Sequence, residues 1–213
     1  MAIFKDKGIL LKKINKGEDT TALVLLTENN GKLLVYLSEK NKSKDRINKD
    51  SLAYAYTEFL INKGQQFLTL KSANIIHNFS NIYNDYDKFV VASVFLEMAD
   101  KMLFANMECK EAVSTILYSL HTLNKGKHTP KLVLATFIFK FLQNEGYMPD
   151  IEDFSVNISK NAVLTLEYIL SNPPSKMFNF SISEDIVVEL YKISILFIRN
   201  SIDMKLYSLE LIT

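Results

Sequence analysis

The chain has 213 residues and a net charge of +1, with 48% hydrophobic and 23% charged residues, which excludes an intrinsically disordered chain and allows one large domain or two small ones. Its single cysteine, Cys109, excludes an internal disulfide and a cysteine-based zinc cluster, and favours a reducing, cytoplasmic compartment. The sequence has no apolar run long enough to span a membrane and no secretory signal at its start, so neither membrane insertion nor export is expected.

Five runs rich in β-branched and aromatic residues predict five strands in the first part of the chain. They cover residues 8–13, 20–27, 32–37, 52–61 and 67–73. The pair Asn30-Gly31 predicts a tight antiparallel hairpin between the second and third strands, because both residues tolerate the positive φ of a primed turn. Five such strands predict a small closed barrel; the oligonucleotide-binding (OB) barrel is the common five-stranded case, and an SH3-like barrel is the alternative.

A basic segment follows the third predicted strand. Its cations are Lys40, Lys42, Lys44, Arg46 and Lys49. It has almost no apolar residues, so we expect a solvated loop, which is either a phosphate-binding loop or an ordinary surface loop of a lysine-rich protein. Residues 1–77 contain 13 Lys and Arg against 8 Asp and Glu, whereas residues 78–213 contain 12 against 16. This modest asymmetry is what a phosphate-facing N-terminal module would show.

From about residue 79 the hydrophobic period changes from two to 3.6, which predicts helices. Five are expected, over residues 87–105, 109–123, 131–144, 158–170 and 183–200. The third is apolar on nearly all sides, as is typical of the central helix of a bundle. The predicted class is therefore α+β, with a five-stranded OB β-barrel domain over residues 1–77 and an α-helical bundle domain over residues 78–213.

No pattern in the sequence points to an enzyme or to a bound cofactor. The six glycines form no phosphate-binding loop, and the three histidines lack the spacing of metal ligands. Paired acids at residues 18–19, 152–153 and 184–185 fit turns and helix starts better than a general acid–base pair. We therefore expect a protein that is not an enzyme and needs no cofactor.

The order and spacing of several short motifs resemble the RecO family of DNA repair proteins. The motifs are Gly8-Ile9-Leu10-Leu11-Lys12-Lys13, Gly17-Glu18-Asp19, Leu25-Leu26-Thr27-Glu28, Gly31-Lys32, Gly146-Tyr147-Met148-Pro149 and Leu206-Tyr207-Ser208-Leu209. Together they cover nearly the whole chain.

The chain departs from the family pattern at two places. Many members carry a four-cysteine zinc lobe where this chain has residues 151–155 without a cysteine, so no zinc is expected. Members also tend to carry an arginine-rich segment after the third strand, whereas residues 39–44 contain lysines instead. Because lysine makes point-charge and not bidentate contacts, weaker phosphate binding is expected there.

The resemblance implies a recombination mediator that binds single- and double-stranded DNA, anneals single strands and, with RecR, helps load RecA onto strands coated by single-strand-binding protein. We expect the phosphate contacts to come from Lys12, Lys13, Lys32, Lys40, Lys42, Lys44, Arg46 and Lys49. Candidates for base stacking are Tyr36, Tyr54, Tyr56 and Phe67, with the barrel core as the alternative location for each.

For the acidic tail of single-strand-binding protein, which the family places on its helical domain, Lys131 and Lys140 are the expected contacts. A different class of function also stays open. The barrel would then belong to a protein–protein adaptor that does not bind nucleic acid directly.

Overall fold

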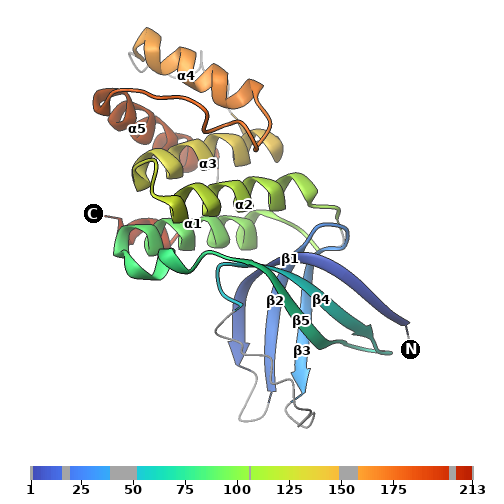
Figure 1. Cartoon of the computed structure of the whole chain (residues 1–213). Coiled ribbons are helices and arrows are strands. Elements are labelled where there is room, and N and C mark those ends of the chain that lie inside the picture. Colours follow the sequence, from blue (N-terminus) through green and yellow to red (C-terminus); the bar gives the residue numbers. More distant parts are fainter. Residues whose placement is uncertain are drawn as a thin grey trace. The chain divides into compact units, whose positions relative to one another are not determined.

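The computed structural model describes residues 2–15, 20–38, 52–105, 107–148, 158–201 and 205–212. Among these residues, five strands come first and five α-helices follow (Figure 1). The α+β class expected from the two hydrophobic periods is therefore confirmed. Within the described ranges, no helix is long and apolar enough to cross a membrane.

The strands are β1 (Ala2–Asn15), β2 (Thr20–Thr27), β3 (Gly31–Ser38), β4 (Ala55–Lys63) and β5 (Leu68–Asn78). They close a barrel in the order β1-β2-β3-β5-β4, in which β1 pairs antiparallel with both β2 and β4. β3 pairs with β5 in parallel through two residue pairs, Val35 with Leu68 and Tyr36 with Thr69. A five-stranded barrel of this topology is an OB fold, so the OB prediction is confirmed over the SH3-like alternative.

The barrel interior is filled by one face of each strand. Along β4, residues Ala55, Thr57, Phe59 and Ile61 are buried, and the residues between them are only half-buried. Leu10, Leu23, Leu25, Leu33, Val35, Leu37, Leu52, Phe59, Ile61 and Leu70 form the core cluster. Burying one such side chain contributes about 1.5–3 kcal/mol to folding, so this face fixes the register of the strands.

Three details of the strands differ from the sequence prediction. β1 begins at Ala2 and not at residue 8, because the segment before Gly8 pairs with β4. β4 begins at Ala55 and not at residue 52, because Tyr54 lies in a turn with a φ of +49°. The β2–β3 hairpin is confirmed, but its turn has three residues and only Gly31 after it has a positive φ, so it is not a primed turn.

The helices are α1 (Tyr86–Met102), α2 (Lys110–Lys125), α3 (Pro130–Asn144), α4 (Lys160–Ser171) and α5 (Glu184–Ser201), all close to their predicted bounds. Short 3₁₀ helices, η1 (Ser80–Asn84) and η3 (Ser208–Leu211), precede and follow them. At the start of α3, Thr129 caps the helix by accepting a hydrogen bond from the Leu132 amide. The residues of α3 from Leu132 to Leu142 are all buried, as its apolar pattern predicts.

The chain divides into two compact units. The first, here called the barrel unit, contains Met1–Ser80 and Leu96–Val113; the second, here called the helical unit, contains Asn81–Phe95 and Ser114–Thr213. The division falls within α1 and within α2, so the barrel unit includes the second half of α1. The predicted domain boundary after residue 77 stays a prediction.

Candidate nucleic-acid interface

The outer surface of the barrel carries an aromatic pair where β3 meets β5. Tyr36 lies on β3, half-buried, and Phe67 lies in the β4–β5 loop with 58% of its surface exposed. Their ring centroids are 5.2 Å apart in an edge-to-face arrangement. Leu34, two residues before Tyr36 and on the same side of β3, is also exposed.

Local backbone geometry explains why these residues meet. The Gly64 amide donates to the Phe67 carbonyl at 3.0 Å, which closes the β4–β5 loop just before β5 pairs with β3. OB folds bind oligonucleotides with the face of strands 2 and 3 and with the loops between strands 1 and 2 and between strands 4 and 5. Tyr36 and Phe67 therefore lie on the surface that this fold uses for nucleic acid, and the structure brings these two predicted stacking candidates together.

The other two predicted stacking candidates are held by the protein. Tyr54 is buried in the turn before β4. Tyr56 is half-buried, and its hydroxyl donates to the Glu28 carboxylate at 2.5 Å. Burial, together with this hydrogen bond and the negative charges of Glu28 and Asp6, raises the pKa of Tyr56 well above its usual range. Tyr54 is therefore part of the protein interior, and Tyr56 is held by its hydrogen bond to Glu28. Neither ring is as accessible to a base as the ring of Phe67.

Two predicted phosphate contacts converge on one carboxylate in the barrel unit. Lys12 Nζ lies 2.5 Å from Asp100 Oδ2, and Lys32 Nζ lies 2.5 Å from the Asp100 carbonyl oxygen and 3.8 Å from Oδ1. An exposed ion pair contributes at most about 1 kcal/mol, so the more exposed Lys12 can exchange Asp100 for a phosphate. Lys32 is more enclosed and also donates to the main chain, which favours a structural role.

Of the six remaining predicted phosphate contacts, one lies among the described residues. Lys13 is exposed on β1. Lys40, Lys42, Lys44, Arg46 and Lys49 lie outside the described residues.

Two further basic residues on the barrel were missed by the sequence prediction. Lys63 is exposed at the end of β4 and pairs in register with Leu68, the neighbour of Phe67. Lys71 is exposed on β5 at an irregularity in the β4–β5 pairing. Their closeness to the β4–β5 loop is the signal that identifies them, since OB folds bind oligonucleotides beside that loop.

In the helical unit, the two predicted partner contacts have different surroundings. Lys140 is buried, with 7% of its surface exposed, and its ammonium donates to Gln143 Oε1 at 2.8 Å and to the Leu170 carbonyl at 2.9 Å. Lys140 therefore satisfies a side-chain oxygen of its own helix and a main-chain carbonyl near the end of α4. Lys131 is exposed at the start of α3, and its ammonium lies 5.9 Å from the centre of the Tyr191 ring.

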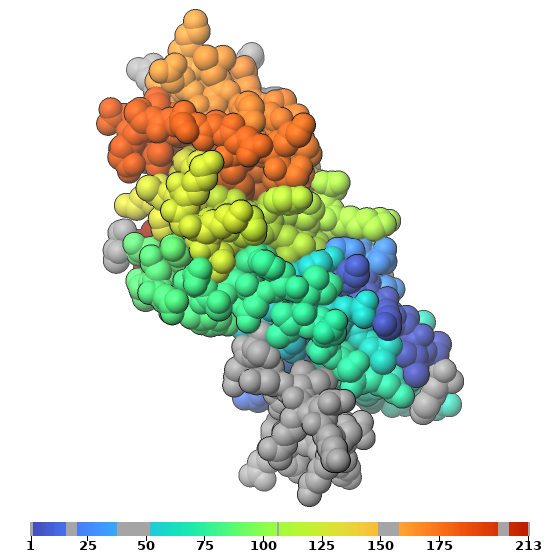
Figure 2. All heavy atoms as spheres, viewed as in Figure 1, coloured from blue at the N-terminus to red at the C-terminus, as the bar shows by residue number. Residues whose placement is uncertain are grey.

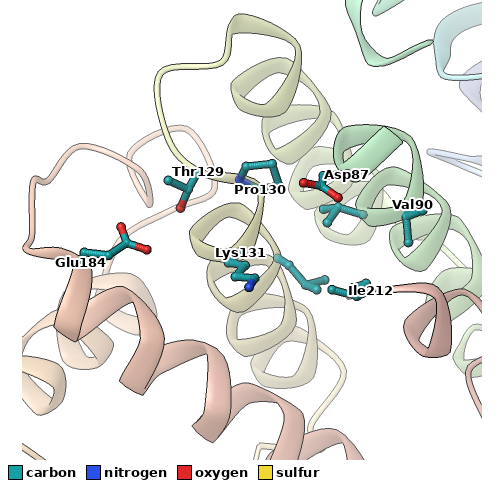
Figure 3. A pocket seen from close by; sticks show the side chains of 9 residues that line it. Asp87, Val90, Thr129, Pro130, Lys131, Glu184 and Ile212 are labelled. Carbon is teal, nitrogen blue, oxygen red and sulfur yellow. The ribbon is translucent and has the colours of Figure 1, made fainter. Parts of the chain in front are cut away.

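Lys131 also lines a cavity of about 240 Å³ within the helical unit (Figure 3). The first turns of three helices contribute to its wall: α1 with Asp87, α3 with Lys131 and α5 with Glu184. Apolar contacts come from Val90, Val91, Pro130, Leu134 and Ile212. The cavity therefore combines one ammonium with an apolar wall and two carboxylates. Among residues within the described ranges, no group of three or more His, Cys, Asp or Glu residues could hold a metal ion.

The barrel topology defines an OB-fold protein in which helices follow the barrel along the chain. Residues 1–79 match the family model for the N-terminal domain of recombination protein O. The chain is 23% identical to DNA repair protein RecO of Acetivibrio thermocellus, over the whole chain and 97% of that protein. It is 21% identical to the protein of that name from Clostridium kluyveri, over the whole chain and 94% of that protein.

A third relative, DNA repair protein RecO of Streptomyces coelicolor, is 29% identical over 72% of this chain and 65% of that protein. The N-terminal part of the chain thus matches the RecO family, and its similarity to proteins named DNA repair protein RecO extends over the whole chain, in keeping with the order of its motifs. By their names, these relatives act in DNA repair.

Proposed function

We propose that the protein is a recombination mediator without catalytic activity. It binds single- and double-stranded DNA on the barrel, anneals complementary single strands and, with RecR, helps load RecA onto strands coated by single-strand-binding protein. The observation that supports this proposal most directly is the Tyr36–Phe67 pair on the oligonucleotide face of an OB barrel.

Annealing by this surface needs no covalent chemistry. Bases of a single strand stack on exposed aromatic rings, and lysines neutralise the phosphates and release counterions. Exposed Lys13, Lys63 and Lys71 on the barrel supply such cations. Partial neutralisation of two strands lowers the repulsion between their backbones, which lets base pairing proceed. The mechanism therefore depends on where rings and charges lie and on no nucleophile or general base.

A protein–protein adaptor is the second candidate, because Leu34 and Phe67 also expose apolar surface of the kind that a protein partner covers. Binding of an isolated oligonucleotide distinguishes the two candidate functions. The mediator binds an isolated oligonucleotide at low salt, whereas the adaptor does not.

We expect Phe67→Ala to weaken binding of single-stranded DNA by about 5- to 150-fold, because base–aromatic stacking contributes about 1–3 kcal/mol per base. The measurement is fluorescence anisotropy of a labelled oligonucleotide over a salt series. The wild type should bind with an affinity that falls steeply with salt. The salt slope of Phe67→Ala should equal that of the wild type, because the lost contact is not ionic.

Phe104→Ala is the matched control, since Phe104 is 68% exposed and lies in the same barrel unit away from β3–β5 pairing. Its affinity should be that of the wild type. Absence of wild-type binding at low salt would reject direct DNA binding and favour the adaptor. Equal losses in the two variants would show that the Tyr36–Phe67 surface is not the binding face.

The acidic tail of single-strand-binding protein is the ligand that we propose for the Lys131 cavity. The Lys131 ammonium can pair with one carboxylate, while Val90, Leu134 and Ile212 accept an apolar side chain. Asp87 and Glu184 line the same cavity, so only a short part of a strongly acidic tail can enter it without repulsion.

Lys131→Ala is expected to weaken binding of a labelled peptide with that tail sequence by about 10-fold, because one charge-assisted hydrogen bond contributes about 1.5 kcal/mol. Isothermal titration or anisotropy measures it. Lys160→Ala, at another exposed lysine at a helix start in the same unit, should bind as the wild type does. If Lys131→Ala binds the peptide as tightly as the wild type does, the tail does not bind in the Lys131 cavity.

A further inference from the structure

We infer that Asp100, near the end of α1, competes with the DNA backbone for Lys12 and so limits how tightly the barrel holds a strand. Its carboxylate occupies an anion position on the barrel that a phosphate of the bound strand takes over. The inference rests on the proposed DNA-binding function and adds to it an acidic residue that lies outside the strands.

The strands around this position carry only basic charges. β2 and β3 are the strands with which OB folds bind oligonucleotides, and β1 is the other neighbour of β2. From Gly8 to the end of β1, and throughout β2 and β3, the charged residues are Lys12, Lys13 and Lys32. The blue surface in Figure 2 belongs to these three strands and to the β2–β3 turn. A carboxylate on this face must therefore come from another part of the chain.

Asp100 supplies that carboxylate and contacts lysines on both sides of β2. Lys12 Nζ on β1 lies 2.5 Å from Asp100 Oδ2. Lys32 Nζ on β3 lies 2.5 Å from the Asp100 main-chain carbonyl oxygen and 3.8 Å from Oδ1. Leu26 of β2, which pairs in register with Lys32, is fully buried although it is not part of the barrel core cluster. The end of α1 therefore covers part of the oligonucleotide face, and all of these residues belong to the barrel unit.

Lys12 is also close to the exposed aromatic pair. Val24 pairs in register with Lys12 on one side and with Leu34 on the other, and Tyr36 is two residues further along β3. With about 4.8 Å between strands and about 3.4 Å per residue, the Cα atoms of Lys12 and Tyr36 are roughly 12 Å apart. A strand whose base stacks at the aromatic pair can therefore bring a nearby phosphate to the Lys12 ammonium.

The two lysines respond differently to such a phosphate. The Lys12 side chain is 49% exposed and meets the Asp100 carboxylate, so a phosphate can replace that carboxylate at little cost. Lys32 is more enclosed and keeps its hydrogen bond to the Asp100 main chain when the carboxylate moves. Exchange therefore frees one ammonium and leaves the end of α1 attached. The released carboxylate lies beside the strand and repels it, so Asp100 weakens binding twice.

Asp100→Asn removes the charge and keeps the main-chain carbonyl that holds Lys32. This variant should bind a labelled single-stranded oligonucleotide about 2- to 5-fold more tightly than the wild type, as loss of competition from one exposed ion pair predicts. The slope of log affinity against log salt should steepen by up to about one, because no carboxylate is left to take up the released counterion. Fluorescence anisotropy over a salt series measures both quantities.

Glu58→Gln is the matched control. It removes the same charge from another exposed ion pair, with Lys5 at 3.1 Å, and lies on β4, which pairs with neither β2 nor β3. Its affinity should equal that of the wild type. A second test combines two substitutions. Lys12→Ala should weaken binding about 2- to 5-fold more in the Asp100→Asn background than in the wild type, because Asp100 no longer holds Lys12 back.

These measurements separate the inference from the proposed function. If the wild type binds but Asp100→Asn binds no more tightly than Glu58→Gln, Asp100 only fastens α1 to the barrel and the inference is rejected. Equal losses from Lys12→Ala in the two backgrounds would reject it as well. In both cases DNA binding by the barrel stands. If neither the wild type nor Asp100→Asn binds at low salt, both proposals are rejected.

Discussion

Gly31→Ala is expected to destabilise the barrel unit by about 2–4 kcal/mol, which makes it one of the most damaging single-methyl changes in the chain. Two independent effects add. Gly31 has a φ of +65°, in the left-handed region that residues with a Cβ enter at a cost of about 1–2 kcal/mol. A Cβ at this position would also lie 2.1 Å from the Met107 carbonyl oxygen, a backbone atom that cannot rotate away.

The close approach of Gly31 to Met107 belongs to a set of backbone contacts between the hairpin and the segment that follows α1. Gly31 and Lys32 form isolated bridges with Ala105, and the Cys109 amide donates to the Glu28 carbonyl at 3.1 Å. The segment between α1 and α2 therefore runs against the β2–β3 hairpin at backbone distance. Urea denaturation followed by circular dichroism measures the loss of stability.

Gly146→Ala separates the two effects. Gly146 has a φ of +74°, but a Cβ there meets no atom within 4 Å, so only the same conformational cost of about 1–2 kcal/mol applies. Gly31→Ala should therefore lower the denaturation midpoint clearly more than Gly146→Ala. Equal shifts in the two variants would show that the contact with Met107 does not constrain the hairpin.

The secondary structure was largely predictable because burial imposes clear periods. The β4 core face repeats every second residue at Thr57, Phe59 and Ile61, and α3 is apolar all round because it is buried all round. The start of β1 was missed because Lys5, Asp6 and Lys7 read as a charged terminus. Only their pairing with β4, more than fifty residues later, makes them a strand.

The sequence identified single residues of the candidate site but not which of them lie together. Tyr36 and Phe67 were separately identifiable, but their contact depends on the short parallel pairing of β3 with β5. Asp100 gave no signal as a partner of Lys12, because the two are 88 residues apart. Lys140 illustrates the converse: in an apolar helix its charge looked available, yet its ammonium is satisfied near the end of α4.

Asp6 gave no sequence signal either, and Asp6→Ala is expected to destabilise the barrel unit by about 2–4 kcal/mol. Asp6 is 3% exposed. Its carboxylate accepts hydrogen bonds from the amide and side chain of Asn29, at 3.3 and 2.8 Å, and from those of Asn30, at 3.0 and 2.6 Å. The carboxylate thus fastens the β2–β3 turn to β1, and its removal leaves backbone donors without an acceptor.

Glu58→Gln is the control for Asp6→Ala, because Glu58 lies on the neighbouring strand in a partly exposed ion pair with Lys5 at 3.1 Å. Such a pair contributes about 1 kcal/mol or less, so Glu58→Gln should change the free energy of unfolding little. An effect of Asp6→Ala no larger than that of Glu58→Gln would mean that the turn is held by other contacts.

The free energy of unfolding at acidic pH tests the same carboxylate. This test does not depend on the size of the cavity that Asp6→Ala leaves. Burial acts to raise the pKa of Asp6, but hydrogen bonds from Asn30, Asn29, Thr27 and Lys7 outweigh it and hold the pKa below its ordinary value. Because the folded pKa is the lower one, the stabilisation is present above the unfolded pKa of about 4 and is lost as pH falls through the folded pKa. Urea midpoints of wild type and Asp6→Ala should therefore lie far apart at pH 7 and converge below about pH 4, since protonation removes from the wild type what the substitution has already removed. A constant separation down to pH 2 would show that the charge of Asp6 does not stabilise the turn.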